Sequence, residues 1–175
     1  MQDKTIFDIV LYGSAAKGKI SPNDVDIAII FREGTLKERL AKIQTIKKRI
    51  SIEQKEKIDM KGILWEELFK ESFFARSGIL VDGISLLDGK PFAQKIGFIS
   101  YSIFIYTLQN KSHTEKIKFN YILSGRKSKG MIALLEGKRL ASGVIQIPTQ
   151  HSLEFEDVLK KQNVTYSILH VLVQR

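Results

Sequence analysis

A glycine-serine pair followed by two spaced aspartates is the part of the sequence whose residue types could do chemistry. The stretch reads Gly13-Ser-Ala-Ala-Lys-Gly-Lys-Ile-Ser-Pro-Asn-Asp-Val-Asp26. Gly13 lets backbone amides approach phosphate oxygens closely, and the hydroxyl of Ser14 adds a donor. We therefore expect Gly13 and Ser14, with Lys17 in the turn that follows, to bind the phosphates of a nucleotide.

Asp24 and Asp26 are candidate metal ligands and catalytic residues. On a strand, residues two apart project to the same face, so the two carboxylates lie together. Such a pair repels and takes up a proton unless a divalent cation compensates it. An Asx turn after Pro22-Asn23 would explain Asp24 alone. It leaves Asp26 unexplained, because a carboxylate inside an apolar run is costly without a partner.

A Walker A phosphate loop is the competing interpretation of the same stretch, since Gly13, Gly18 and Lys19 satisfy its spacing. The next position contradicts it, because Ile20 stands where a hydroxyl must reach the metal. The turn Ser21-Pro22-Asn23 also breaks the chain where the long helix of such a loop should begin. We reject this interpretation.

The pattern of apolar residues in the first half predicts a sheet covered by helices, in the order β-turn-β-α-β-α-β. Leu36, Leu40 and Ile43 begin a helical repeat of three- and four-residue steps. Asp88-Gly89-Lys90-Pro91 is a plausible boundary, which gives a domain over residues 1–90. The predicted strands cover residues 7–11, 25–31, 57–64 and 79–87, and the predicted helices cover residues 35–50 and 65–77.

The second half, residues 91–175, predicts a small basic α+β domain of unknown role. Ser112 with Glu115 forms the pattern of a capping box at the start of a helix that runs to Leu123. Ser152 is expected to cap a later helix. Strands are predicted over residues 98–106, 144–147 and 164–173, a short helical stretch after the loop 125–130, and no internal repeat.

The segment from Tyr12-Gly13-Ser14 to Asp24-Val25-Asp26-Ile27 resembles the nucleotidyltransferase superfamily that includes DNA polymerase β, and most of all its minimal nucleotidyltransferases. The resemblance covers about residues 5–90. It implies an α+β fold, namely a small mixed sheet with helices on one side. It also implies a third acidic residue on a neighbouring strand, and Asp59 is the natural candidate; the alternative for Asp59 is an edge-strand carboxylate that faces water.

The same resemblance implies a function. Asp24, Asp26 and Asp59 would hold two Mg or Mn ions, with Asp59 helping to deprotonate the attacking hydroxyl. The reaction would transfer a nucleoside monophosphate from ATP or another nucleoside triphosphate to a hydroxyl of RNA, protein or a small molecule. The alternative function is a non-catalytic antitoxin or regulatory module that binds RNA or a partner protein. Minimal nucleotidyltransferases often work with an all-helical partner, which the second half does not resemble.

The charge of the chain is concentrated in its second half. The net charge is +9, of which residues 1–89 carry +1 and residues 90–175 carry +8. Such a basic half suggests an acidic partner, an RNA or protein acceptor, although lysine also serves as plain solubilising surface. The expected nucleic-acid contacts are Arg126, Lys127 and Lys129, with Tyr101, Tyr106 and Tyr121 as stacking surfaces; the alternative is a solvated loop and core aromatics.

Composition excludes several classes of protein. The chain has no cysteine, which removes disulfides, thiolate zinc sites and thiol nucleophiles, and leaves oxygen ligands for a hard metal. Every apolar run is too short to span a membrane, and the start lacks the features of a signal peptide. We therefore expect a cytoplasmic protein without a membrane partner, and a homo-oligomer stays an open alternative.

Overall fold

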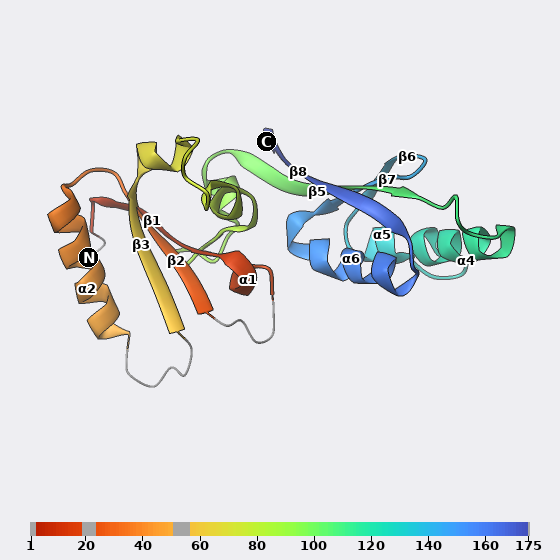
Figure 1. The fold of residues 1–175 in the computed structure, drawn as a ribbon, viewed down its shortest axis with the longest axis horizontal. Coiled ribbons are helices and arrows are strands. Elements are labelled where there is room, and N and C mark those ends of the chain that lie inside the picture. The colour runs from red at the N-terminus through yellow and green to blue at the C-terminus, as the bar shows by residue number, and fades with distance from the viewer. Residues whose placement is uncertain (1–2, 19–23, 51–56, 175) are drawn as a thin grey trace. The chain divides into compact units, whose positions relative to one another are not determined.

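The chain forms two compact units, Met1–Gly97 and Phe98–Arg175 (Figure 1). A computed structural model describes residues 3–18, 24–50 and 57–174 of the protein. The turn expected over Ser21-Pro22-Asn23 lies outside the described residues. The division into domains at residue 90 stays a prediction about what folds independently.

The first unit is built on a mixed sheet of four strands in the order β3-β2-β1-β4 (Figure 1). Strand β2 runs parallel to β3 and antiparallel to β1. These three strands match the predicted ones to within a few residues. The predicted strand over residues 79–87 is wrong for its first four residues, which lie in the π-helical turn η2 (Gly78–Asp82), and only Ile84 and Ser85 form a strand. Ile79 is fully buried in that turn, and a short apolar run fits either structure. The strands are β1 (Ile6–Tyr12), β2 (Asp24–Phe31), β3 (Lys57–Leu64) and β4 (Ile84–Ser85).

Helix α2 (Leu36–Arg49) covers one face of this sheet, as the helical repeat predicts. Thr35 and Glu38 form a capping box at its start. Its Ile43 packs against Ile27 and Ile29 of β2. Because β2 contributes every second residue to each face, its alternate apolar side chains must be buried on the other face as well.

The predicted α+β fold, a mixed sheet with helices, is confirmed, and short helical turns cover the face opposite α2 as well. Leu68 of η1 (Trp65–Phe69), Ile79 of η2 (Gly78–Asp82) and Phe92 of α3 (Phe92–Lys95) pack there with Ala28 and Ile30. The sheet is buried on both faces because β2 is apolar at successive positions from Ile27 to Phe31.

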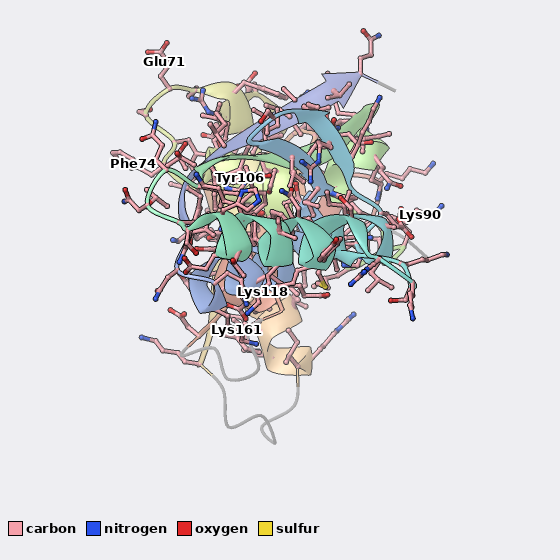
Figure 2. All side chains as sticks on the ribbon, turned by 90° about the vertical axis from the view of Figure 1, so that its right-hand side faces the viewer. Glu71, Phe74, Lys90, Tyr106, Lys118 and Lys161 are labelled. Atoms are coloured by element: carbon pink, nitrogen blue, oxygen red, sulfur yellow. The ribbon has the colours of Figure 1, made fainter. Side chains whose placement is uncertain are left out.

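The helix predicted over residues 65–77 is also wrong. Leu68 is fully buried and holds the first turn, but Lys70 adopts an extended conformation that ends it. Phe74 is 97% exposed and projects from the surface, as does Glu71 (Figure 2). Because Phe74 packs against no buried side chain in the described part of the chain, continuing the helix through it would gain no tertiary contact to stabilise that helix.

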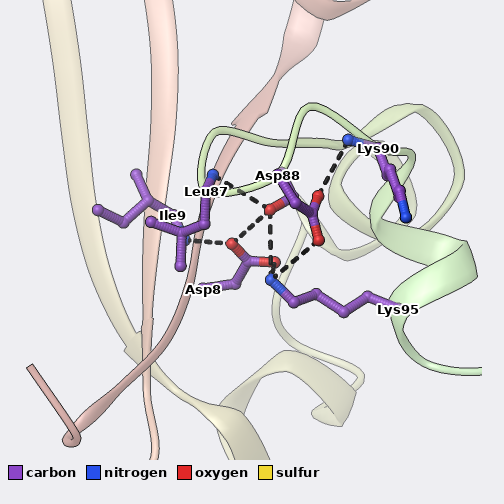
Figure 3. Close-up of polar contacts among 7 residues, drawn as sticks. Asp8, Ile9, Leu87, Asp88, Lys90 and Lys95 are labelled. Carbon is purple, nitrogen blue, oxygen red and sulfur yellow. Dashed lines mark hydrogen bonds and ion pairs between the residues drawn. The ribbon is translucent and has the colours of Figure 1, made fainter. Parts of the chain in front are cut away.

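A buried carboxylate on β1 fastens the segment after β4 to the sheet (Figure 3). Asp8 is fully buried, and its Oδ1 accepts hydrogen bonds from the hydroxyl of Ser85 at 2.8 Å and the backbone N–H of Ile9 at 2.7 Å. Its Oδ2 has Lys95 Nζ at 2.9 Å as a charge partner, and Lys95 also lies 3.6 Å from Asp88. The cluster therefore ties the end of α3 to the middle of the sheet.

The second unit is an antiparallel sheet, in the order β6-β7-β5-β8, with three helices on one face. Phe104 of β5 stacks edge-on with Phe155 of α6 at 4.8 Å, and Tyr106 does so with Phe119 of α4 at 5.5 Å. Figure 2 labels Tyr106 on this unit. The elements are β5 (Phe98–Thr107), α4 (His113–Ser124), α5 (Met131–Leu134), β6 (Lys138–Ala141), β7 (Val144–Pro148), η3 (Thr149–His151), α6 (Ser152–Lys161) and β8 (Thr165–Gln174).

The α+β prediction for this half is confirmed, with two corrections. The capping box of Ser112 and Glu115 is present. Ser152, in contrast, is the first residue of α6 and makes no capping hydrogen bond, because the short helix η3 leads directly into α6. Strand β6 was not predicted, since its four residues are all exposed and show no apolar alternation. Among the described ranges, no helix has the length and apolar character needed to cross a membrane.

Candidate active site of the first unit

The register of the sheet sets Tyr12, Asp26 and Asp59 in one row across three strands. Tyr12 at the end of β1 pairs with Asp26, and Asp26 pairs with Asp59 in the parallel ladder between β2 and β3. Directly paired residues point to the same face, as do residues two apart on a strand. Asp24, two residues before Asp26, therefore completes a group of three carboxylates at this end of one face.

Gly13 lies against Asp26. It follows the last residue of β1 and opens the short helix α1 (Gly13–Ala16) with a φ of +74°, in the left-handed region that glycine tolerates best. A methyl group placed on its Cα would collide with a carboxylate oxygen of Asp26. Glycine suits this position on both counts, and the glycine-serine turn therefore lies directly against the carboxylate of Asp26.

Like charges and burial dominate the electrostatics of Asp26. Burial raises the pKa of its carboxyl, and the negative charges of Asp24 and Asp59 raise it further. The cation of Lys61 opposes them. Lys61 Nζ lies 3.4 Å from Asp59 Oδ2, and its own pKa is raised, first by Tyr12 and also by Asp59. Among the described residues, Lys61 is thus a counter-charge to this group of carboxylates.

Lys17, expected to bind phosphate, has a protein partner. Its Nζ lies 3.2 Å from Asp82 Oδ2, at the end of η2, and only 9% of the Asp82 side chain is exposed. The pair ties the turn after α1 to η2, and the Lys17 side chain remains 42% exposed. Ser14 lies in α1 directly after Gly13.

The donor set suits a hard divalent ion in its chemistry. Asp24, Asp26 and Asp59 offer carboxylate oxygens on one face, and the raised pKa of Asp26 reflects negative charge that a cation would offset. As the side chains stand, the described part of the chain contains no group of three or more His, Cys, Asp or Glu close enough to hold an ion. A metal ion bound by all three carboxylates would compete with Lys61 for Asp59.

Two residues of this site were missed from the sequence. Lys61 follows Asp59 by two positions on β3, so strand alternation could have placed both on one face. Asp82 carried no such signal, because residues 79–87 were predicted as strand and the π-helical turn was not.

The predicted nucleic-acid contacts of the second unit divide into two groups. Arg126, Lys127 and Lys129 are exposed on the loop after α4. Of the three tyrosines, Tyr121 is 45% exposed beside that loop, with the guanidinium carbon of Arg126 5.2 Å from its ring centroid. Tyr106 is buried in the core and therefore offers no stacking surface.

Comparison with known proteins agrees with the geometry of the first unit. The family model described as "Polymerase beta, Nucleotidyltransferase" matches residues 1–82. A search of curated proteins and a search of solved structures each found no match. The match contains the glycine-serine turn and all three aspartates, and it supports a nucleotidyltransferase-type function. The match over residues 1–82 supports membership of the first unit in the DNA polymerase β-like nucleotidyltransferase superfamily.

Proposed function

We propose that the first unit is an active, metal-dependent nucleotidyltransferase of the minimal type. It transfers a nucleoside monophosphate from a nucleoside triphosphate to a hydroxyl group of RNA, protein or a small molecule. One observation carries the proposal: the pairing of Asp26 with Asp59, together with the contact between Asp26 and Gly13, gathers the acidic groups beside the turn.

In the proposed reaction, an acceptor oxygen attacks the α-phosphorus of the triphosphate. The new oxygen–phosphorus bond forms as the bond from the α-phosphorus to the bridging oxygen breaks, and pyrophosphate leaves with that electron pair. Backbone N–H groups at Gly13 and the hydroxyl of Ser14 bind the phosphates and hold the α-phosphorus in line. Asp59 accepts the proton of the attacking hydroxyl.

Asp24, Asp26 and Asp59 would hold Mg or Mn. When bound, the ions would supply activation of the acceptor oxygen and charge stabilisation of the leaving pyrophosphate. Without a bound ion, the positive charge of Lys61 offsets part of the negative charge of these carboxylates. Its flexible side chain can turn away from Asp59 toward phosphate oxygens.

Transfer of a labelled nucleotide tests the proposal. Wild-type protein is incubated with each α-labelled nucleoside triphosphate, Mg or Mn, and a cell extract that supplies acceptors. The double variant Asp24→Ala/Asp26→Ala should lose the transferred label. A control variant, Glu71→Ala/Asp157→Ala, removes two exposed carboxylates elsewhere and should retain it. Equal labelling by the wild type and the aspartate variant would contradict a catalytic role.

One observation favours the second candidate, a non-catalytic binding module. Asp59 is paired with Lys61, and no described group of three ligands is poised for a metal. On this hypothesis Lys61 is a permanent structural partner rather than a displaceable one. Lys61→Met separates the candidates: it should increase metal affinity if Lys61 competes with the ion, and should only destabilise the fold if the ion pair is structural.

A further inference from the structure

A closed cationic loop, residues Gly125–Gly130, joins α4 to α5 in the second unit. Its two ends touch: a methyl group on Gly125 would collide with the carbonyl oxygen of Ser128, and one on Gly130 with the backbone of Gly125. The backbone N–H of Gly125 donates to the carbonyl of Tyr121 at 2.8 Å, and Gly125 has a φ of +79°. The compact backbone leaves Arg126, Lys127 and Lys129 exposed on the outside.

The loop forms one wall of a shallow cavity of about 520 Å³. Tyr121 of α4 and Met131 and Leu134 of α5 supply the apolar part of the lining. Tyr121 is 45% exposed and Leu134 is 58% exposed, so the surface is open to a ligand. Arg126 lies over the Tyr121 ring, 5.2 Å from its centroid. Every residue that lines the cavity is described, and none of them is acidic.

The three cations of the loop have no carboxylate partner among the described residues. Basic charge continues along this end of α4, where Arg139 of β6 reaches Asn120 Oδ1 at 3.4 Å. Three unpaired cations on a closed loop, within a unit that is basic overall, attract a polyanion. Positive charge alone would attract any polyanion. The exposed ring of Tyr121 favours a polyanion that also carries flat aromatic groups.

We propose that this cavity binds a single-stranded nucleic acid. Arg126 turns from the Tyr121 ring to contact a phosphate, Lys127 and Lys129 contact the neighbouring phosphates, and a base takes the place of Arg126 on the ring and the apolar lining. A duplex would satisfy the cations and leave the ring unused, because its bases are stacked on one another. As the site of a nucleic-acid acceptor, the cavity rests on the proposed function; as a binding site, it does not.

Fluorescence anisotropy with the full chain tests the proposal, using labelled RNA and DNA strands of the same sequence, about 12 nucleotides long, and the matching duplex. The single strands should bind more tightly than the duplex. Their binding should persist in Asp24→Ala/Asp26→Ala, so loss of transfer and loss of binding are separate outcomes. The comparison of RNA with DNA decides whether the 2′-hydroxyl contributes to recognition.

The triple variant Arg126→Ala/Lys127→Ala/Lys129→Ala should bind weakly and with less dependence on salt. Each phosphate contact on a single strand contributes about 0.7 to the slope of log affinity against log salt, so three contribute about 2. Raising salt fourfold, from about 50 to about 200 mM, should therefore cost the wild type about 15- to 20-fold more affinity than the variant. Lys47→Ala/Lys48→Ala/Arg49→Ala removes the same charge from the exposed end of α2 and should behave as wild type.

Two substitutions of Tyr121 test stacking. Tyr121→Phe keeps the ring and should bind as wild type, whereas Tyr121→Leu should weaken binding by about tenfold. Circular dichroism checks that the variants are folded. If the loop variant matches the control variant in affinity and salt dependence, or if only the duplex binds, the proposed site is wrong.

Discussion

Replacement of Gly13 by alanine separates two demands that the structure makes on one residue. The left-handed backbone at Gly13 costs an L-residue about 1–2 kcal/mol. The added methyl group also collides with the Asp26 carboxylate, and moving that side chain off its rotamer costs about 0.5–1.5 kcal/mol more. We expect Gly13→Ala to destabilise the first unit by roughly 2–3 kcal/mol.

Gly89 offers a matched control for the backbone contribution. It has a φ of +73°, close to that of Gly13, and a methyl group there would meet no atom within 4 Å. Gly89→Ala should therefore cost only the backbone strain, about 1–2 kcal/mol. The difference between the two variants measures the contact with Asp26.

A double-mutant cycle isolates that contact. In a background of Asp26→Ala, Gly13→Ala should cost no more than Gly89→Ala does, because the obstructing carboxylate is gone. The ring centroid of Trp65, the only tryptophan in the sequence, lies 4.5 Å from that of Phe7 in the first unit, so tryptophan fluorescence reports the unfolding of that unit. Each kcal/mol should lower the melting temperature by about 4–8 °C for a unit of this size.

A Gly13→Ala variant that is no more destabilised than Gly89→Ala would contradict the predicted contact with Asp26. An unchanged cost of Gly13→Ala in the Asp26→Ala background would contradict that contact as well. Either result would mean that the glycine-serine turn and the carboxylates do not form one site.

Three further predictions concern stability. Asp26→Asn should stabilise the fold at neutral pH by up to about 1 kcal/mol. Burial, Asp24 and Asp59 raise the pKa of Asp26, so ionisation of its carboxyl opposes folding. In urea titrations, the gain in unfolding free energy of the variant over the wild type should grow as pH rises through that pKa and should vanish in acid. Lys95→Met should cost about 3 kcal/mol because it strands a buried Asp8, and Asp8→Asn/Lys95→Met should recover much of the loss in the same assay. Ser112→Ala should cost about 1 kcal/mol in thermal unfolding followed by circular dichroism, since it removes the cap of α4; an unchanged midpoint would show that the cap is not needed.

Local patterns were sufficient for several elements of this protein. Strand β3 and helix α2 follow from their own periodicity, and the capping box of α4 follows from Ser112 and Glu115, three residues apart. Each of these signals lies within one element, so it survives without knowledge of the fold. The predictions that failed concern residues 65–77 and 79–87. Whether an apolar side chain there is buried depends on which other segments pack on the same face of the sheet.

The amino-acid sequence was enough to identify the candidate residues of the first site: a glycine-serine turn, Asp24 and Asp26 at strand spacing, and Asp59 on another strand. The pairing of Asp59 with Asp26 became known from the folded chain, because the register between two strands separated by a helix depends on how their faces pack. The fold also pairs Lys17 with Asp82 across elements. Such contacts between distant segments leave no trace in the spacing of residues along the chain.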